Sequence, residues 1–363
     1  MAVTEQGLLA ALTSVQDPHT GQDFVSTRAL RNVQIHGGDV AFDVELGYPA
    51  KSLLPELRRS LGAAAKGVAG VENVSVNITT KVVAHAVQRG VQLLPQVKNI
   101  IAVASGKGGV GKSTTAANLA LALAAEGASV GVLDADIYGP SQPMMMGINR
   151  RPESDDGKTM EPLENYGVQV MSIGFLVDQD EAMIWRGPMA TQALEQLLRQ
   201  TNWKDLDYLI IDMPPGTGDI QLTLSQRVPM TGAVIVTTPQ DIALLDAKKG
   251  IKMFEKVGVP ILGIVENMAV HVCSNCGQVE HIFGADGGKK MAADYGMDYL
   301  GALPLDMSIR LQADSGKPTV VADPDGEVAQ IYKKVAREVA VKIARQAKDF
   351  SSKFPTISIS KNT

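Results

Sequence analysis

The pattern of apolar and polar positions divides the chain into two parts. In the first eighty residues, apolar and polar positions alternate over short stretches, which is typical of strands with one exposed face, and helical spacing occurs between them. The expected elements are a helix at 5–12, strands at 31–36 and 40–46 joined by a hairpin, a helix at 53–65 and a strand at 71–78. The pattern predicts a small α+β domain of order α-β-β-α-β, spanning 1–82.

From residue 98 onward the sequence pattern changes to short, continuous apolar runs separated by amphipathic segments of helix length. Such runs suit strands that are buried on both faces of a parallel sheet. The runs lie at 100–104, 129–133, 168–171, 208–211, 233–237 and 261–265. Alternating strands and helices predict an α/β fold, a doubly wound parallel sheet, for 98–350, with 83–97 as a linker and 351–363 as a flexible tail.

An amphipathic pattern at 328–348 predicts a long helix. We interpret it as packed on the sheet with its Lys and Arg side chains outward, and a helix lying on a membrane surface is the alternative.

Charge and composition narrow the classes of partner. Lys and Arg number 34 against 39 Asp and Glu, a net charge of −5, which argues against a general nucleic-acid coat. No run of about 20 apolar residues predicts a membrane span. The N-terminal segment lacks the basic and apolar regions of a secretion signal. We therefore expect a cytoplasmic protein with neither nucleic acid nor membrane as a partner.

The segment GKGGVGKS at 106–113 matches the P-loop pattern, with a predicted strand before it and a predicted helix after it. Glycines let successive backbone N–H groups turn inward onto phosphate oxygens, and the helix N-terminus adds partial positive charge. Lys112 is expected to reach the β- and γ-phosphates of ATP, and the Ser113 hydroxyl to bind Mg²⁺. The nucleotide-binding residues expected in this segment are Gly106, Gly108, Gly109, Val110, Gly111, Lys112 and Ser113.

Two further segments are expected to complete this site. Asp134 and Asp136 end the second strand, at the carboxyl edge where α/β sheets bind ligands. Asp212 closes an apolar run, a Walker B pattern that delivers a carboxylate to the Mg²⁺ shell. Gly216 lies in the loop that follows, where its N–H could sense a γ-phosphate. Lys107 is either a solvated loop lysine or a second cation aimed at phosphate.

The chain contains two cysteines, Cys273 and Cys276, in a C-x₂-C spacing. This spacing presents two sulfurs to one metal centre, whereas iron–sulfur clusters and structural zinc each usually require four ligands. Two cysteines from each subunit of a homodimer would supply four. Three alternatives stand beside an iron–sulfur cluster: a redox disulfide, a zinc ion at the dimer axis, and a mononuclear site completed by His271 and His281.

The motifs carry a family resemblance. Residues 107–113 resemble the deviant Walker A segment of the MinD, ParA and nitrogenase iron protein group. The segments 134–141, 185–189, 212–219, 237–240 and 266–268, with the cysteine pair, resemble the Mrp/ApbC iron–sulfur carrier family from about residue 98 to 345. The first eighty residues resemble the iron–sulfur assembly-type domain that precedes the ATPase in bacterial members. Many such domains have a cysteine before the second helix, where this chain has YPA at 48–50, so a thiolate role is not expected there.

The resemblance implies roles for individual residues. Lys107 would reach across a dimer to the partner's nucleotide, and Thr114 would join Lys112 and Ser113 in holding phosphates and Mg²⁺. Asp136 would position the attacking water, and Asp212 would hold Mg²⁺ through its hydration shell. Two residues are implied at the adenine, namely Asn267 and Pro304.

Together these observations predict a homodimeric ATPase of slow turnover that binds a labile iron–sulfur cluster, of 4Fe–4S type, and transfers it to apoproteins. Apo iron–sulfur proteins and cluster-assembly scaffolds are the expected partners. A spatial-organising ATPase with a zinc-clasped dimer is the alternative. It predicts that DNA or lipid stimulates ATP hydrolysis, which the carrier hypothesis does not.

Overall fold

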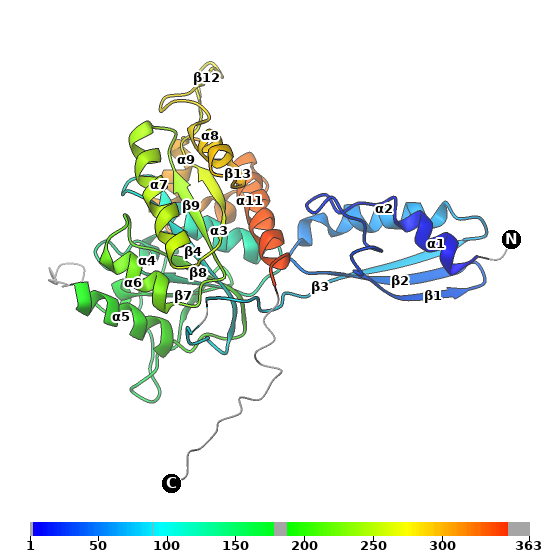
Figure 1. Ribbon diagram of the computed structural model, residues 1–363, viewed down its shortest axis with the longest axis horizontal. Helices are drawn as coiled ribbons and strands as arrows, with labels where there is room; N and C mark the ends of the chain where they lie inside the picture. The colour runs from blue at the N-terminus through cyan, green and yellow to red at the C-terminus, as the bar shows by residue number, and fades with distance from the viewer. Residues whose placement is uncertain (1–2, 89, 178–186, 348–363) are drawn as a thin grey trace, which may run out of the picture.

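The structure is a computed structural model of the 363-residue chain, and it describes residues 3–88, 90–177 and 187–347 (Figure 1). The expected tail at 351–363 and the first two residues of the 185–189 motif therefore lie outside the described residues.

The N-terminal domain has the expected order of elements: α1 (Glu5–Leu12), β1 (Leu30–His36), β2 (Asp39–Leu46), α2 (Leu54–Lys66) and β3 (Asn73–Thr80). β2 is the central strand, antiparallel to β1 and parallel to β3. The two helices lie along one face of this sheet (Figure 1). Its core is made of apolar side chains that alternate along the strands and recur along the helices, including Leu8, Leu12, Phe42, Leu57 and Leu61.

The second domain is built on an eight-stranded sheet of order β13-β10-β9-β4-β8-β5-β7-β6. The six expected strands are present as β4 (Val97–Ala104), β5 (Val130–Asp134), β7 (Val168–Ser172), β8 (Leu206–Asp212), β9 (Gly232–Thr237) and β10 (Ile261–Glu266). They run parallel to one another, which confirms the doubly wound α/β class. Two edge strands were not expected: β6 (Leu163–Asn165), antiparallel to β7, and β13 (Tyr299–Ala302), parallel to β10.

Helices fill the connections of this sheet. They are α3 (Lys112–Ala125), α4 (Gln142–Met145), α5 (Gly187–Gln200), α6 (Asp219–Arg227), α7 (Asp241–Lys256), α8 (Gly287–Asp294), α9 (Met307–Asp314), α10 (Thr319–Ala322) and α11 (Glu327–Ala344). The connection after β4 leads to β5, toward the β6 edge, whereas the connection after β8 leads to β9, toward the β13 edge, so a switch point lies between the adjacent strands β4 and β8. Ligands of open α/β sheets bind at the carboxyl edge of such a switch point.

The amphipathic C-terminal pattern forms helix α11. Its apolar side is buried against α3 and β13, and the buried set is Ala329, Tyr332, Val335, Ala336, Val339, Ala340, Val341 and Ile343. The helix therefore packs on the domain, as interpreted from the sequence. Among the described residues, no helix combines the length and apolar character needed to cross a membrane.

The segment between the domains packs against the second domain. His85 is 2% exposed, and its Nδ1 lies 3.0 Å from Oδ1 of Asn99 at the start of β4. The Ala86 N–H donates to the Ala347 carbonyl (2.9 Å), and Gln88 Nε2 donates to the Ser225 carbonyl (3.0 Å). These bonds anchor the expected linker at three points.

A polar joint holds the two domains together at the end of α3. Glu126 is 2% exposed, and its carboxylate accepts hydrogen bonds from the N–H (2.9 Å) and hydroxyl (2.6 Å) of Ser52 in the small domain. Arg337 on α11 forms an ion pair with the same carboxylate, with 2.6 Å between Nη1 and Oε1. His19 of the small domain lies between Arg337 (3.1 Å) and Glu338 (2.9 Å).

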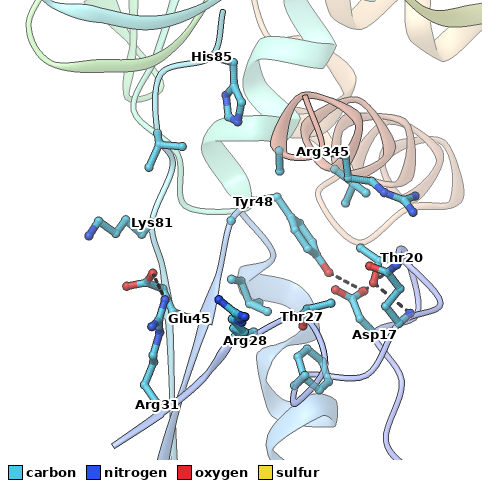
Figure 2. Close-up of a pocket in the computed structure, with 18 residues that line it drawn as sticks. Asp17, Thr20, Thr27, Arg28, Arg31, Glu45, Tyr48, Lys81, His85 and Arg345 are labelled. Carbon is cyan, nitrogen blue, oxygen red and sulfur yellow. Dashed lines mark hydrogen bonds and ion pairs between the residues drawn. The ribbon is translucent and has the colours of Figure 1, made fainter. Parts of the chain in front are cut away.

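A cavity of about 250 Å³ opens beside this joint (Figure 2). Tyr48 and Asp17 line it and are joined by a hydrogen bond that the Tyr48 hydroxyl donates (2.8 Å), and Arg345 lines it from the end of α11. Burial and the adjacent Asp17 carboxylate both raise the pKa of Tyr48, so the phenol stays protonated and keeps this hydrogen bond.

The joint predicts a specific loss of stability. In Arg337→Leu the buried Glu126 carboxylate loses its cation, and we expect the free energy of unfolding to fall by about 3 kcal/mol. Urea denaturation of the full chain measures this. Arg310→Leu is the matched control, because its pair with Asp314 has side chains 66% and 51% exposed, and we expect a loss of less than about 0.5 kcal/mol. Equal losses in the two variants would contradict the role of the joint.

Candidate functional site

The P-loop lies between β4 and α3 and is shaped by close neighbours on both sides. A Cβ on Gly106 would lie 2.1 Å from the backbone of Asp246 on α7, and a Cβ on Gly111 would lie 2.1 Å from Nδ2 of Asn267. Gly109 and Gly111 also adopt φ of +82° and +80°, which disfavours other residues. By contrast, Gly108 and Gly109 have open space where a Cβ would be. The loop is therefore held tightly at its ends and open at its middle.

The loop leads directly into α3, where Lys112, Ser113 and Thr114 form the first turn. No acidic side chain lies in that turn, so the partial positive charge of the helix N-terminus is left available to an anion. The loop and helix start thus fit a bound phosphate chain.

The structure brings Lys112, Ser113, Asp136 and Asp212 together, as expected from the sequence. Lys112 is 6% exposed, and its Nζ forms an ion pair with Asp212 Oδ1 and a hydrogen bond with Ser113 Oγ (3.0 Å). Asp136 Oδ2 lies 3.9 Å from the same Nζ. Adjacent strands make this possible, because β4, β8 and β5 are consecutive in the sheet and end at one edge.

The site carries more negative than positive charge. Asp134 is fully buried and accepts hydrogen bonds from the N–H groups of Ser141 (3.0 Å) and Gln142 (3.1 Å). Burial and the neighbouring Asp212 carboxylate raise the pKa of Asp134, and burial raises the pKa of Asp136. Carboxylates crowded around one ammonium, with a serine hydroxyl beside them, are a donor set that suits a hard divalent cation such as Mg²⁺.

Gln142 is a residue of this site that the sequence did not reveal. It is fully buried, and its Nε2 donates to Asp212 Oδ2 (2.9 Å) and to the Ser113 carbonyl (3.1 Å). Its Oε1 and the neighbouring Ser141 Oγ are buried and have no hydrogen-bond partner among the described residues. A glutamine at the start of a short helix carries no motif, so only the fold places it here.

Gly216 is held by the backbone in this structure. Its N–H donates to the Ser105 carbonyl after β4 (2.9 Å), and its expected contact with a γ-phosphate stays a prediction. Gly216 has φ of +95°, which shapes the loop after β8.

Lys107 is half-exposed and forms no ion pair with any residue that the structure describes. The Ser105 hydroxyl donates to the Lys107 carbonyl (2.9 Å), which fixes the backbone while the side chain stays available.

Asn267 and Pro304 come to the same edge of the sheet. Glu266 on β10 pairs with Ala302 on β13, and these two residues follow the paired ends. The Asn267 side chain is 8% exposed and donates to the Val110 carbonyl of the P-loop (2.9 Å). In this structure its amide braces the loop, and its implied contact with adenine stays a prediction.

The two cysteines lie at the tip of a hairpin. Strands β11 (His271–Val272) and β12 (Val279–Glu280) pair antiparallel, and the Gly277 N–H donates to the Cys273 carbonyl (2.8 Å). Cys276 is exposed and Cys273 partly exposed. Hydrogen bonds from the Cys276 and Asn275 backbone lower the pKa of the Cys273 thiol, which favours the thiolate that binds metals.

The nearby histidines are held by backbone groups. Nδ1 of His271 lies 3.0 Å from the Leu305 carbonyl, and Nδ1 of His281 lies 3.0 Å from the Ala269 carbonyl. Across residues 3–88, 90–177 and 187–347, no cluster of three or more Cys, His, Asp or Glu side chains is placed to hold a metal ion. The structure thus lends no support to the alternative of a mononuclear site within one chain.

Comparison with known proteins finds a matching family model for each of the two domains. Residues 96–340 match the family model described as NUBPL iron-transfer P-loop NTPase, and residues 5–78 match that of an iron–sulfur cluster assembly protein. The chain is 61% identical over 278 residues to the iron–sulfur cluster carrier protein of Pseudomonas fragi, covering 76% of this chain and 97% of the relative. It is 51% identical to the Escherichia coli K12 iron–sulfur cluster carrier protein, covering 92% and 90% of the two chains.

Two solved structures resemble the second domain. A nucleotide-binding protein from Archaeoglobus fulgidus in complex with ADP is 38% identical, with a TM-score of 0.56, covering 64% of this chain and 90% of that one. The cell division ATPase MinD of Pyrococcus furiosus shares the fold at 23% identity and a TM-score of 0.50, covering 66% and 98%. Since the first family model spans more than half of the chain and the relatives align over most of their lengths, the chain belongs to the family of NUBPL-type iron-transfer P-loop NTPases.

Proposed function

We propose that this chain is an ATP-hydrolysing carrier that binds a labile iron–sulfur cluster, of 4Fe–4S type, between two copies of itself and transfers it to apo iron–sulfur proteins. The observation that carries the proposal is the hairpin tip with both cysteines, one partly exposed and one exposed, in a chain that also has a P-loop site. Its relatives are named iron–sulfur cluster carrier proteins, which supports iron–sulfur clusters as the cargo.

The P-loop site supports nucleotide binding through residues that are already arranged. The open backbone at Gly108 and Gly109 and the first turn of α3 would hold the phosphates of ATP. Lys112, which now pairs with Asp212, would turn toward the β- and γ-phosphates, because a phosphate chain offers it more negative charge than one carboxylate.

The same residues supply what hydrolysis needs. Ser113 and Asp212 would hold Mg²⁺, which when bound would neutralise charge on the phosphates. Asp136 lies within 3.9 Å of Lys112 and is partly open, so its carboxylate is placed to orient a water molecule beside the terminal phosphate. Asn267 and Pro304, at the edge formed by β10 and β13, would border the adenine.

Two thiolates per chain support a homodimer. Iron–sulfur clusters are usually held by four cysteine thiolates, and this chain has two, both at one hairpin tip. A cluster on the two-fold axis of a dimer would have two ligands from each copy. The side chain of Lys107, which forms no ion pair with the described residues, would reach the partner's nucleotide in such a dimer, so ATP binding and cluster binding would favour the same assembly.

The proposed partners and location follow from this cargo. Cluster-assembly scaffolds would supply the cluster, apo iron–sulfur proteins would accept it, and the cytoplasm is the proposed compartment. The inward packing of α11 disfavours the spatial-organising alternative, because that helix has no free apolar face for a membrane.

We expect anaerobic reconstitution of the full chain with iron and sulfide to give about four irons per two chains and a visible charge-transfer absorption. Cys273→Ala and Cys276→Ala should each lose the absorption and still bind a fluorescent ATP analogue with nearly unchanged affinity. Ser274→Ala, in the same turn, is the matched control and should keep the cluster. Stoichiometric zinc that iron cannot displace would contradict the cargo, and hydrolysis stimulated by DNA or lipid would favour the spatial-organising alternative.

The lowered pKa of Cys273 predicts its reactivity. A depressed pKa means that the thiolate forms at lower pH, so iodoacetamide should alkylate Cys273 half-maximally at a lower pH than a cysteine in an unstructured peptide. Labelling of the reduced, metal-free chain, quantified at each cysteine by mass spectrometry, measures this. A midpoint at or above that of the peptide would show that the hairpin does not activate the thiol.

Substitutions of Lys107 and Lys112 should affect ATP hydrolysis and nucleotide binding differently. In Lys107→Ala, kcat for ATP should fall by about a hundredfold with little change in nucleotide affinity, because the lysine would act only on the partner's nucleotide in a dimer. Lys112→Ala should weaken nucleotide binding itself. Steady-state kinetics with equilibrium binding distinguish the two, and an unchanged kcat in Lys107→Ala would exclude a catalytic role across a dimer.

A further inference from the structure

Gln142 joins three segments of the nucleotide site. Its side chain bonds to Asp212 at the end of β8 and to the carbonyl of Ser113 on α3, while its backbone N–H donates to Asp134 at the end of β5 (3.1 Å). All of these contacts lie in the interior, because Gln142 is 0% exposed. One side chain therefore links the backbone of Ser113 to the carboxylate of Asp212, the two residues proposed to hold Mg²⁺.

The two oxygens of Asp212 have different partners. Oδ1 pairs with Lys112, whereas Oδ2 accepts the hydrogen bond from Gln142 Nε2 (2.9 Å). If Lys112 moves to a phosphate, Asp212 loses its ion pair with the ammonium and retains the hydrogen bond from the Gln142 amide. The hydrogen bond from Gln142 would then hold the carboxylate in one orientation while a second cation takes the place of the ammonium.

The oxygen of the Gln142 amide indicates a further hydrogen-bond donor that would arrive with this cation. Gln142 Oε1 is buried and has no donor among the described residues, although a buried acceptor is normally paired. Because it belongs to the same amide as Nε2, which lies 2.9 Å from Asp212, Oε1 is within reach of a water molecule bound to a metal at that carboxylate. The Ser141 hydroxyl, also unpaired among the described residues, is the adjacent side chain.

We propose that Gln142 is a positioning residue for the divalent cation: its Nε2 orients Asp212 and Ser113, and its Oε1 accepts a hydrogen bond from a water of the cation's shell. The inference rests on the proposed nucleotide function and adds a residue to it. Outer-shell partners of this kind orient the ligands and tune the affinity of the metal site.

The amide group is required on this view. Methionine has similar length but would leave Asp212 Oδ2 without its donor and would remove the side-chain donor to the Ser113 carbonyl. Asparagine keeps the amide but is one methylene shorter, so it would reach these acceptors less well. The two substitutions therefore differ in chemistry and in reach.

The test is a Mg²⁺ titration of the binding of a fluorescent ATP analogue to the full chain, with EDTA for the metal-free reference. In Gln142→Met the Mg²⁺ concentration at half-saturation should rise by about tenfold. Metal-free nucleotide affinity should fall by clearly less than the affinity measured with Mg²⁺, since Gln142 would act mainly through the metal. Gln142→Asn should fall between this variant and the native chain.

Gln169→Met is the matched control. Gln169 lies on β7 and bonds with the backbone of Lys204, outside the nucleotide site, so its Mg²⁺ midpoint should equal that of the native chain. Thermal melting of each variant verifies folding, and Gln142→Asn alone carries the test if Gln142→Met does not fold.

A Mg²⁺ midpoint unchanged in both Gln142 variants, or equal losses with and without metal, would overturn the inference and leave the proposed function intact. Nucleotide binding by the native chain that is absent, or indifferent to Mg²⁺, would overturn the proposed function as well.

Discussion

The main physical constraint on the nucleotide site is the buried Lys112 ammonium, which lies among several carboxylates. Lys112 faces Asp212 and Asp136, with Asp134 buried nearby; Lys112, Asp134 and Asp212 are buried, and Asp136 is partly exposed. Removing so many charges from solvent is costly unless each one has partners. The sheet supplies them by ending β4, β5 and β8 side by side, and the helix that begins at Lys112 supplies the rest.

Close neighbours also constrain the P-loop that precedes Lys112. Asn267 donates to the loop from one side, and α7 approaches Gly106 from the other. A loop held at both ends keeps its middle N–H groups in place before any anion arrives. Ligand binding then needs little ordering of the chain, which lowers its entropic cost.

Much of this could be predicted from the sequence, because the controlling signals are local. Continuous apolar runs located the six inner strands, and the spacing of glycines with Lys112 and Ser113 located the phosphate site. Strand β6 has three residues and β13 has four, including a glycine, so neither has enough length to show a period. Gln142 and the committed N–H of Gly216 depend on contacts between distant segments, such as Gln142 with Asp212 and Gly216 with Ser105, which no local pattern encodes.

The hairpin that carries the cysteines, unlike the nucleotide site, lies outside the eight-stranded sheet and its core. Its strands have two residues each, and it stands apart from the eight-stranded sheet, at the top of the molecule (Figure 1). Neither thiol belongs to the hydrophobic core. In small zinc domains the metal provides the folding energy, so losing it means unfolding. Here the core is complete without the thiols, so the proposed cluster would leave and return at this tip without the chain unfolding.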